Sequence, residues 1–379
     1  MRAGAGWIGI ADRVRGETMF DPAGLDRYGP EGPRSSVTTS GATLCGLDAL
    51  MPRGTLMVET RLSPEGRPQT LFEISRTHPW IGTLSLRAVP GGGVILTESQ
   101  GDGIRHATLP AFPDARTEVL RLTYSWDAPA RRGWLTAECP DSDRVAMVAV
   151  DAPHPLPMSD LQALIRAPRA ARMDGDVVFV ALSDHVEPVG PTPGLSGGVA
   201  FDTPGGQRPV AAFRRGDRVT VGDGIEMPVL QAVSRMVPAL GSFSPVHLRA
   251  PYFGLRQDIV VAPGQRLLLS GSRVEYLFGH ETVLVAARHL INGTSALWFR
   301  GAPPLWRYHQ LLLPENEMLQ AGGAALESLF IGRLRRRPEQ LARSILSGCD
   351  RRQLPEHARP SRPVLKPYEA MAIAGPNAA

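Results

Sequence analysis

Short runs of alternating apolar and polar residues, separated by turns rich in glycine and proline, fill residues 37–186. The clearest run is Val119–Trp126 (VLRLTYSW), which a turn joins to a second run at Trp134–Glu138. Such alternation places successive side chains on opposite faces, and strands that recur at about 8–12 residues are typical of a β-sandwich. Only Ser159–Ile165 has the spacing of a helix, with Ser159 as its capping residue. This half of the chain is therefore predicted to be an antiparallel β-sandwich of the jelly-roll kind.

Length and composition fit two β-rich domains. At 379 residues the chain exceeds one ordinary domain. Its 40 glycines and 35 prolines suit turn-rich β architectures better than helical bundles. The net charge of +4 comes from 41 basic and 37 acidic residues, but residues 333–379 hold ten basic and four acidic ones, so the rest sums to −2. A basic body that would attract nucleic acid is absent, and no nucleic-acid partner is expected.

Signals for membranes, export and cofactors are weak throughout the sequence. No apolar run reaches the ~18 residues of a membrane span, and Asp12 and Arg13 interrupt the N-terminal segment before a signal-peptide core forms. Localisation is left open between the cytoplasm and export by a route that reads no cleavable signal. Cys45, Cys139 and Cys349 are too far apart in sequence for a metal motif or disulfide framework. No zinc, calcium, nucleotide or other cofactor is expected, because the motifs that bind them are missing.

A proline-rich segment divides the chain. Residues 187–194 (EPVGPTPG) contain prolines and glycines without periodicity, as linkers do. Near the C-terminus, one helical pattern begins at Pro338, a residue favoured in the first helical turn, and ends at Gly348. The predicted organisation is a loosely ordered lead-in (1–33), the β-sandwich (34–188), a linker (189–193), a second all-β domain (194–332) and a basic tail with one short helix and mobile remainder (333–379).

The first domain resembles laminin-G or concanavalin-like sandwiches. The resemblance is carried by GTLMVETRLSPEG (residues 54–66) and by LRLTYSWDAPARRGWLTAE (residues 120–138). It implies binding of a glycan or a protein. Some glycosidases of this fold use Glu-x-Asp-x-x-Glu, which sets two carboxylates on one face of a strand. The chain has no Glu-x-Asp pair, so that route of glycoside hydrolysis is excluded.

The second domain opens on GLSGGVAFDTPGGQRPVAAFRRGDRV, residues 194–219. This stretch resembles the start of a Hint domain, the self-cleaving module of hedgehog proteins and inteins, in its bacterial branch. That branch opens on Cys-Phe-x-x-Gly-Thr and reaches Gly-Asp-x-Val after a further apolar position. Without a gap, this register matches at Gly198, Phe201, Thr203, Gly206, Val210, Phe213, Gly216, Asp217 and Val219.

Three later blocks extend the resemblance over about 194–332. Asp258–Leu269 is similar to an apolar strand followed by Ser-Pro-x-His-Arg and a second strand. Glu281–Gly293 is similar to the family's Val-Pro-Ala-x-x-Leu-x-x-Gly segment, and Tyr308–Gly332 to its closing Tyr-x-His-Leu-Leu-x-x-x-His-Glu and hairpin. The resemblance implies an all-β Hint fold and an ancestral reaction of self-catalysed peptide cleavage through an acyl shift.

The residues that this reaction needs are replaced. The resemblance places the nucleophilic cysteine at Gly194 and the proton-donating histidine of Ser-Pro-x-His-Arg at Gln265. The later His-Glu pair stands as Asn316–Glu317. Acyl transfer requires an attacking side chain and an acid that protonates the leaving nitrogen, and an amide cannot supply that proton near neutral pH. We therefore predict a retained fold whose reaction is largely lost.

Two residues are weak substitutes for the missing groups. Ser196 is two positions beyond the family's cysteine, a shift of roughly 6–7 Å in extended chain, and is otherwise read as a turn residue. His309, beside Tyr308, is the best-placed histidine; His247, His280 and His289 are read as surface or structural residues, and Asp217 as a turn residue.

Three functions stay open at this point. The chain is an inactive descendant of a self-cleaving protein, or a non-catalytic binding protein whose sandwich recognises a glycan or a protein. As a third alternative, it cleaves itself slowly at the linker by using Ser196 or water.

Overall fold

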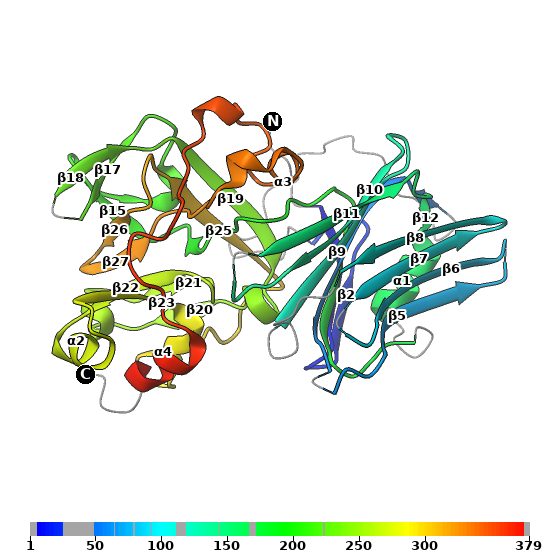
Figure 1. The fold of residues 1–379 in the computed structure, drawn as a ribbon, viewed down its shortest axis with the longest axis horizontal. Coiled ribbons are helices and arrows are strands. Elements are labelled where there is room, and N and C mark those ends of the chain that lie inside the picture. Colours follow the sequence, from blue (N-terminus) through cyan, green and yellow to red (C-terminus); the bar gives the residue numbers. More distant parts are fainter. Residues whose placement is uncertain are drawn as a thin grey trace. The chain divides into compact units, whose positions relative to one another are not determined.

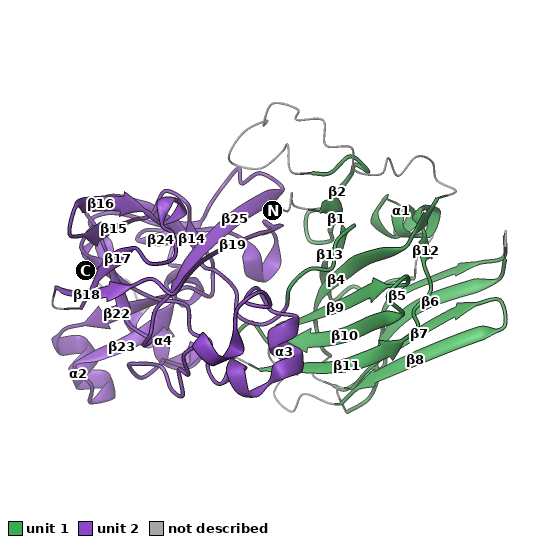
Figure 2. Cartoon of the chain, turned by 90° about the horizontal axis from the view of Figure 1, so that it is seen from above, with its two compact units in different colours: residues 1–188 green, residues 189–379 purple. Residues whose placement is uncertain are grey.

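The computed structural model describes residues 6–25, 49–63, 65–78, 80–91, 93–110, 119–142, 144–166, 172–222 and 224–374. They divide into two compact units, Met1–Pro188 and Val189–Ala379 (Figure 2). Antiparallel strands dominate both units (Figure 1), which confirms the predicted mainly β fold class. In the described ranges, no helix combines the length and the apolar character that crossing a membrane requires.

Unit 1 is built from two larger sheets. The seven-stranded sheet has the order β11-β10-β9-β4-β13-β1-β2, and the four-stranded sheet the order β5-β6-β7-β8. The first comprises β1 (Trp7–Asp12), β2 (Glu17–Phe20), β4 (Arg53–Arg61), β9 (Val119–Asp127), β10 (Arg132–Glu138), β11 (Val145–Asp151) and β13 (Val177–Ser183). The second comprises β5 (Gln69–Arg76), β6 (Gly82–Ala88), β7 (Val94–Gln100) and β8 (Gly103–Leu109); the short pair is β3 (Leu50–Met51) and β12 (Leu156–Pro157).

One apolar core lies between these sheets. Strand β9 contributes Leu122 and Tyr124, while Leu86 and Leu96 come from the four-stranded sheet. Helix α1 (Met158–Arg166) closes the core with its apolar side, formed by Met158, Leu161, Leu164 and Ile165. The strand predicted over Val119–Trp126 is therefore present, and the predicted helix begins one residue earlier than expected.

The expectation of a loosely ordered lead-in is wrong for the described part of residues 1–33. Strand β1 lies between β13 and β2, and all six of its residues are buried. A strand buried on both faces needs no polar alternation, because neither side meets water. The sequence WIGIAD therefore lacks the period-two pattern that reveals half-exposed strands.

Unit 2 contains two six-stranded sheets and a hairpin. The first sheet has the order β19-β25-β14-β21-β20-β24 and the second the order β18-β17-β26-β27-β22-β23. The first comprises β14 (Leu195–Ser196), β19 (Gln231–Pro238), β20 (Val246–Leu248), β21 (Ile259–Val261), β24 (Ala296–Trp298) and β25 (Leu305–Leu312). The second comprises β17 (Arg218–Val221), β18 (Ile225–Pro228), β22 (Arg266–Ser270), β23 (Thr282–Ala286), β26 (Met318–Ala321) and β27 (Ala324–Glu327); the hairpin is β15 (Ala200–Thr203) and β16 (Gly206–Pro209).

Unit 2 also contains short helices, some between its strands and the others after the last strand, β27. The α-helices are α2 (Ser272–Phe278), α3 (Pro338–Ala342) and α4 (Pro367–Ala374). The 3₁₀ turns are η2 (Val210–Ala212), η3 (Gly241–Phe243), η4 (Tyr252–Gly254), η5 (Ala287–Leu290), η6 (Leu334–Arg336) and η7 (Arg351–Gln353).

The C-terminal segment packs against unit 2 instead of forming a mobile tail with one helix. Helix α3 starts at Pro338 as expected, but α4 is a second helix. Leu346 is fully buried in an apolar cluster with Leu312. Further along, Leu365 joins the main core of the unit, and its N–H donates to the carbonyl of Leu284 at 2.9 Å. The predicted mobility is therefore corrected over residues 333–374.

Candidate functional site

Gly194, the position of the family's nucleophile, immediately precedes the central strand β14. Leu195 in that strand pairs with Val261 of β21 on one side and with His309 of β25 on the other. The carbonyl of Gly194 accepts a hydrogen bond from the N–H of Ala262 at 2.7 Å. Backbone pairing thus holds Leu195 on both sides and Gly194 on the side of β21.

Gln265 fills the space into which a side chain at residue 194 would project. A Cβ atom added to Gly194 would lie 2.5 Å from Oε1 and 3.1 Å from Cβ of Gln265. Contacts below about 3 Å require a neighbour to move, and Gln265 is only 5% exposed. The two positions named from the sequence are therefore in contact, with no room between them for a thiol.

Hydrogen bonds from both ends of its side-chain amide hold Gln265 beside Gly194. Its Nε2 donates to the carbonyls of Arg266 and Glu327, both at 3.0 Å. Gln310 on β25 donates from Nε2 to Oε1 of Gln265 at 2.8 Å and to the carbonyl of Glu327 at 3.1 Å. Gln265, Gln310 and the Glu327 carbonyl are called the amide cluster below. Buried amides satisfied in this way stabilise a structure but transfer no proton near neutral pH.

Gln310 is a residue of the site that sequence reasoning misses. The signal is present, because Tyr-x-His-Leu-Leu laid on Tyr308 puts its histidine at Gln310. Sequence reasoning selects the neighbouring His309 instead, because it is the histidine present in this stretch. Two residues aligned with family histidines are therefore glutamines, bonded to each other beside Gly194.

Ser196 lies on the same strand but is already bonded elsewhere. Its Oγ accepts a hydrogen bond from the indole N–H of Trp306 at 2.9 Å. Ser196 pairs with Tyr308 and Leu195 pairs with His309, so Ser196 and His309 project from opposite faces of the sheet. The structure does not bring this hydroxyl and this imidazole together.

His309 is poorly suited to donate a proton. Burial, with a smaller contribution from the nearby Arg307 charge, lowers the pKa of His309 to about 4. Its Nε2 lies 3.2 Å from the position of a Cβ added to Gly197, which places the ring against that glycine. The imidazole is therefore neutral at pH 7 and faces away from Gly194 and the amide cluster.

The remaining polar candidates have structural partners. Asn316, which stands for the family's later histidine, accepts from the N–H of Ser361 through Oδ1 at 3.0 Å. The N–H of Glu317 donates to Oγ of Ser328 at 3.1 Å, and the Asp217 carboxylate closes a turn by accepting from the N–H of Arg214 at 2.7 Å. His247 lies 2.8 Å from an oxygen of Asp258, while His280 is exposed.

The described residues contain no group of three or more His, Cys, Asp or Glu side chains placed to hold a metal ion. Cys139 is buried in unit 1, and burial raises the pKa of the Cys349 thiol in unit 2. Cys45 lies outside the described residues.

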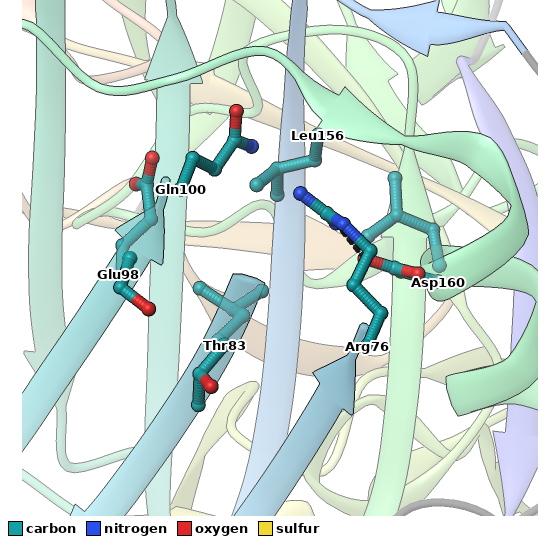
Figure 3. Close-up of a pocket in the computed structure, with 9 residues that line it drawn as sticks. Arg76, Thr83, Glu98, Gln100, Leu156 and Asp160 are labelled. Atoms are coloured by element: carbon teal, nitrogen blue, oxygen red, sulfur yellow. Dashed lines mark hydrogen bonds and ion pairs between the residues drawn. The ribbon is translucent and has the colours of Figure 1, made fainter. Parts of the chain in front are cut away.

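Unit 1 has a small polar pocket, shown in Figure 3, that sequence reasoning does not find. Its walls come from separate segments: the end of β5, the start of β6, the end of β7, β12 and helix α1. The lining residues are Arg76, Thr83, Leu84, Glu98, Ser99, Gln100, Leu156, Asp160 and Leu161. Since no local motif links them, only the folded sheet brings them together.

Comparison with solved structures gives weak matches. The CBM40 module of the IT-sialidase of Ruminococcus gnavus is 17% identical, with 35% of this chain and 64% of that chain covered and a TM-score of 0.23. The LG1-3 region of the laminin α2 chain is 9% identical over 74% of this chain and 54% of that one, with a TM-score of 0.24. Tailspike protein 2 of Escherichia coli O157:H7 bacteriophage CAB120 is 10% identical over 35% and 17%, with a TM-score of 0.22. Likeness at this level carries no argument about function, and the chain spans less than two thirds of each of these three structures.

Comparison by sequence gives a family match within unit 2. No curated protein matches the chain. The family model described as the Hint domain matches residues 193–333, a range that begins one residue before Gly194 and includes the whole amide cluster. The resemblance drawn from the opening stretch and the later blocks is confirmed by this match. Residues 193–333 of this chain are therefore similar to Hint domains in sequence.

Proposed function

We propose that the Hint domain of this protein is a scaffold that no longer cleaves the peptide bond before Gly194. The observation that carries this proposal is the amide cluster, which occupies the space of the missing nucleophilic side chain. Acyl transfer needs a thiol or hydroxyl beside the scissile carbonyl, and Gly194 has neither. Departure of an amine needs a proton donor, and Gln265 and Gln310 cannot act as one near neutral pH.

Slow cleavage through Ser196 or water receives less support from the geometry. The Ser196 hydroxyl already accepts from Trp306, and His309 lies on the other face of the strand. A displacement of about 1 Å from productive geometry can cost about 100-fold in rate. Water lacks an activating base at the amide cluster, because both side chains there are neutral amides.

We further propose that the intact chain acts as a binding protein through unit 1. The polar pocket supports this role, since it contains a buried N–H of Arg76 that has no hydrogen-bond partner. An unpaired buried donor costs free energy unless a bound molecule satisfies it. A glycan or a protein is the class of partner expected from the sequence.

Restoring three of the four lost groups tests the first proposal. The variant Gly194→Cys/Gln265→His/Gln310→His is expected to cleave before residue 194 when a thiol is added, while the wild type stays intact over the same hours. Gly194→Ala/Gln265→His/Gln310→His is the matched control, because it carries the same two imidazoles without a nucleophile. Electrophoresis measures cleavage and circular dichroism confirms folding. If the triple variant that carries Gly194→Cys folds but never cleaves, these three positions do not explain the loss of self-cleavage.

A further inference from the structure

We propose that the pocket of unit 1 binds one hydroxyl group of a neutral carbohydrate, with the Arg76 guanidinium as its principal donor. This assignment rests on the binding role proposed above, but it does not depend on the loss of self-cleavage in the Hint domain.

The guanidinium of Arg76 is held in a fixed orientation with one donor left over. Its Nη1 pairs with the carboxylate of Asp160 in the first turn of α1, as the dashed line in Figure 3 shows, and its Nε donates to the carbonyl of Trp80 at 3.3 Å. The guanidinium carbon lies 4.9 Å from the centre of the Trp80 ring. Nη2 is buried without a partner. A planar donor fixed by an ion pair and an aromatic ring is preorganised for an acceptor oxygen.

Gly82 makes this orientation sterically allowed. A Cβ atom at residue 82 would lie 2.6 Å from Nη2 and 2.8 Å from Cζ of Arg76. Residue 82 is the first of β6 and pairs with Gln100 at the end of β7, so the guanidinium lies over the backbone at the mouth of the hairpin. The indole N–H of Trp80 is a second buried donor without a partner beside the same guanidinium.

The pocket also offers acceptors, which favours a hydroxyl over other oxygen groups. Gln100 donates from Nε2 to the carbonyl of Pro155 at 2.9 Å, which turns its amide oxygen into the group available to accept. The carboxylate of Asp160 is a further acceptor in the lining, whereas both oxygens of the buried Glu98 carboxylate already accept from Tyr124 and His154. A peptide carbonyl or a carboxylate could only accept from Arg76, whereas a hydroxyl both accepts and donates.

The charges of the lining and the volume of the pocket restrict the class of ligand further. The lining holds one positive group, Arg76, and two negative ones, Glu98 and Asp160, so it does not attract an anion. Glu98 is 1% exposed and bonded to Tyr124 through a 2.6 Å hydrogen bond, which fixes its position. The enclosed volume of about 10 Å³ is room for one water-sized group. One hydroxyl therefore enters, and the rest of the sugar stays outside.

The test is binding of the full chain to an array of neutral oligosaccharides and of sialic acid- or uronic acid-containing ones. We expect wild-type binding to neutral glycans, with affinity for the best one weakened about tenfold or more in Arg76→Lys, since a hydrogen bond to a charged group is lost. Trp80→Phe keeps an aromatic side chain but replaces the indole and its N–H, so it tests the second donor without breaking the Arg76–Asp160 ion pair. Arg87→Lys and Trp298→Phe are matched controls at exposed sites outside the pocket. Thermal melting of each variant checks its fold.

The outcomes of the array test the site and the ligand class separately. Neutral-glycan binding that weakens in folded Arg76→Lys and not in Arg87→Lys supports the site. Binding unchanged in both pocket variants would overturn the site while leaving a binding role for unit 1. Preference for the acidic glycans would overturn the ligand class. No binding of any array glycan by the wild type would overturn the inference, leaving a single water as the occupant of the pocket, whereas the fate of the peptide bond before Gly194 would be unaffected.

Discussion

Deletion of residues 334–374 together with the residues that follow them is expected to unfold unit 2. This segment contributes Leu334, Leu341, Leu346 and Leu354 to the cluster around Leu312, and Leu365, Ala370 and Ile373 to the main core of the unit. Burial of a leucine side chain is worth roughly 1.5–3 kcal/mol, and a domain has only about 5–15 kcal/mol of net stability. Removing seven buried apolar residues therefore exceeds what one unit can lose.

Hydrogen–deuterium exchange measured by mass spectrometry checks this expectation unit by unit. Peptides from unit 2 should lose protection in the truncated chain, while those of unit 1 keep theirs. Leu346→Ala gives a graded version, with an expected loss of about 2–5 kcal/mol from the cavity left behind. Met371→Ala is its matched control in the same segment, because Met371 is 67% exposed. Unchanged protection of unit 2 in the truncated chain would contradict the packed role of this segment.

Lowering the pH from 7 to 4 is expected to destabilise unit 2 through His309. Its pKa is lowered from 6.5 to about 4 in the folded chain. The unfolded chain therefore takes up a proton below pH 6.5 while the folded chain does not, and stability falls as the pH drops from 6.5 towards 4. This lowering of the pKa of His309 corresponds to at most about 3 kcal/mol, and to about 2 kcal/mol after allowance for the exposed part of the ring.

Comparison of two histidine variants isolates this contribution. Denaturant unfolding of unit 2, followed between pH 7 and pH 4, should become less steeply pH-dependent in His309→Gln by about 2 kcal/mol over that window. His280→Gln, which removes an exposed histidine, is the matched control. Burial also lowers the pKa of His357, which adds in the same direction but is present in both variants and so cancels. Equal pH dependence in His309→Gln and wild type would contradict the neutral, buried state of His309.

Sequence patterns predict a strand well when polar and apolar residues alternate along it. Val119–Trp126 alternates, and β9 spans Val119–Asp127. Its polar side chains Arg121, Thr123 and Ser125 are nevertheless buried. Strand β1 is also buried on both faces but is mostly apolar, so it lacks a period-two pattern and reads as an unpatterned segment. In the C-terminal segment Leu341 lies in α3, inside the helical pattern found from sequence, whereas Leu354 and Leu365 are buried outside helices and strands, where no period marks them. Their burial is a property of the surface they cover, which no local pattern records.

The two candidate sites also differ in how far the sequence predicts them. Gly194 and Gln265 are found from sequence because each stands inside a motif of fixed spacing, and the fold brings them into contact. Gln310 stands in such a motif too, yet its neighbour His309 is the more conspicuous side chain. The pocket of unit 1 joins Arg76 to Asp160 across 84 positions of sequence. Only the pairing of β5 with β6 and the placement of α1 reveal it.

The intact mass of purified wild-type protein, incubated with hydroxylamine or a thiol, tests the loss of self-cleavage most directly. An activated ester or thioester at residue 194 would be captured by either reagent, whereas an unreactive peptide bond is left whole. We expect one species at 40.9 kDa throughout the incubation. Two fragments of roughly 21 and 20 kDa, from about 110 Da per residue and a break before Gly194, would contradict the proposal that this Hint domain has lost its reaction.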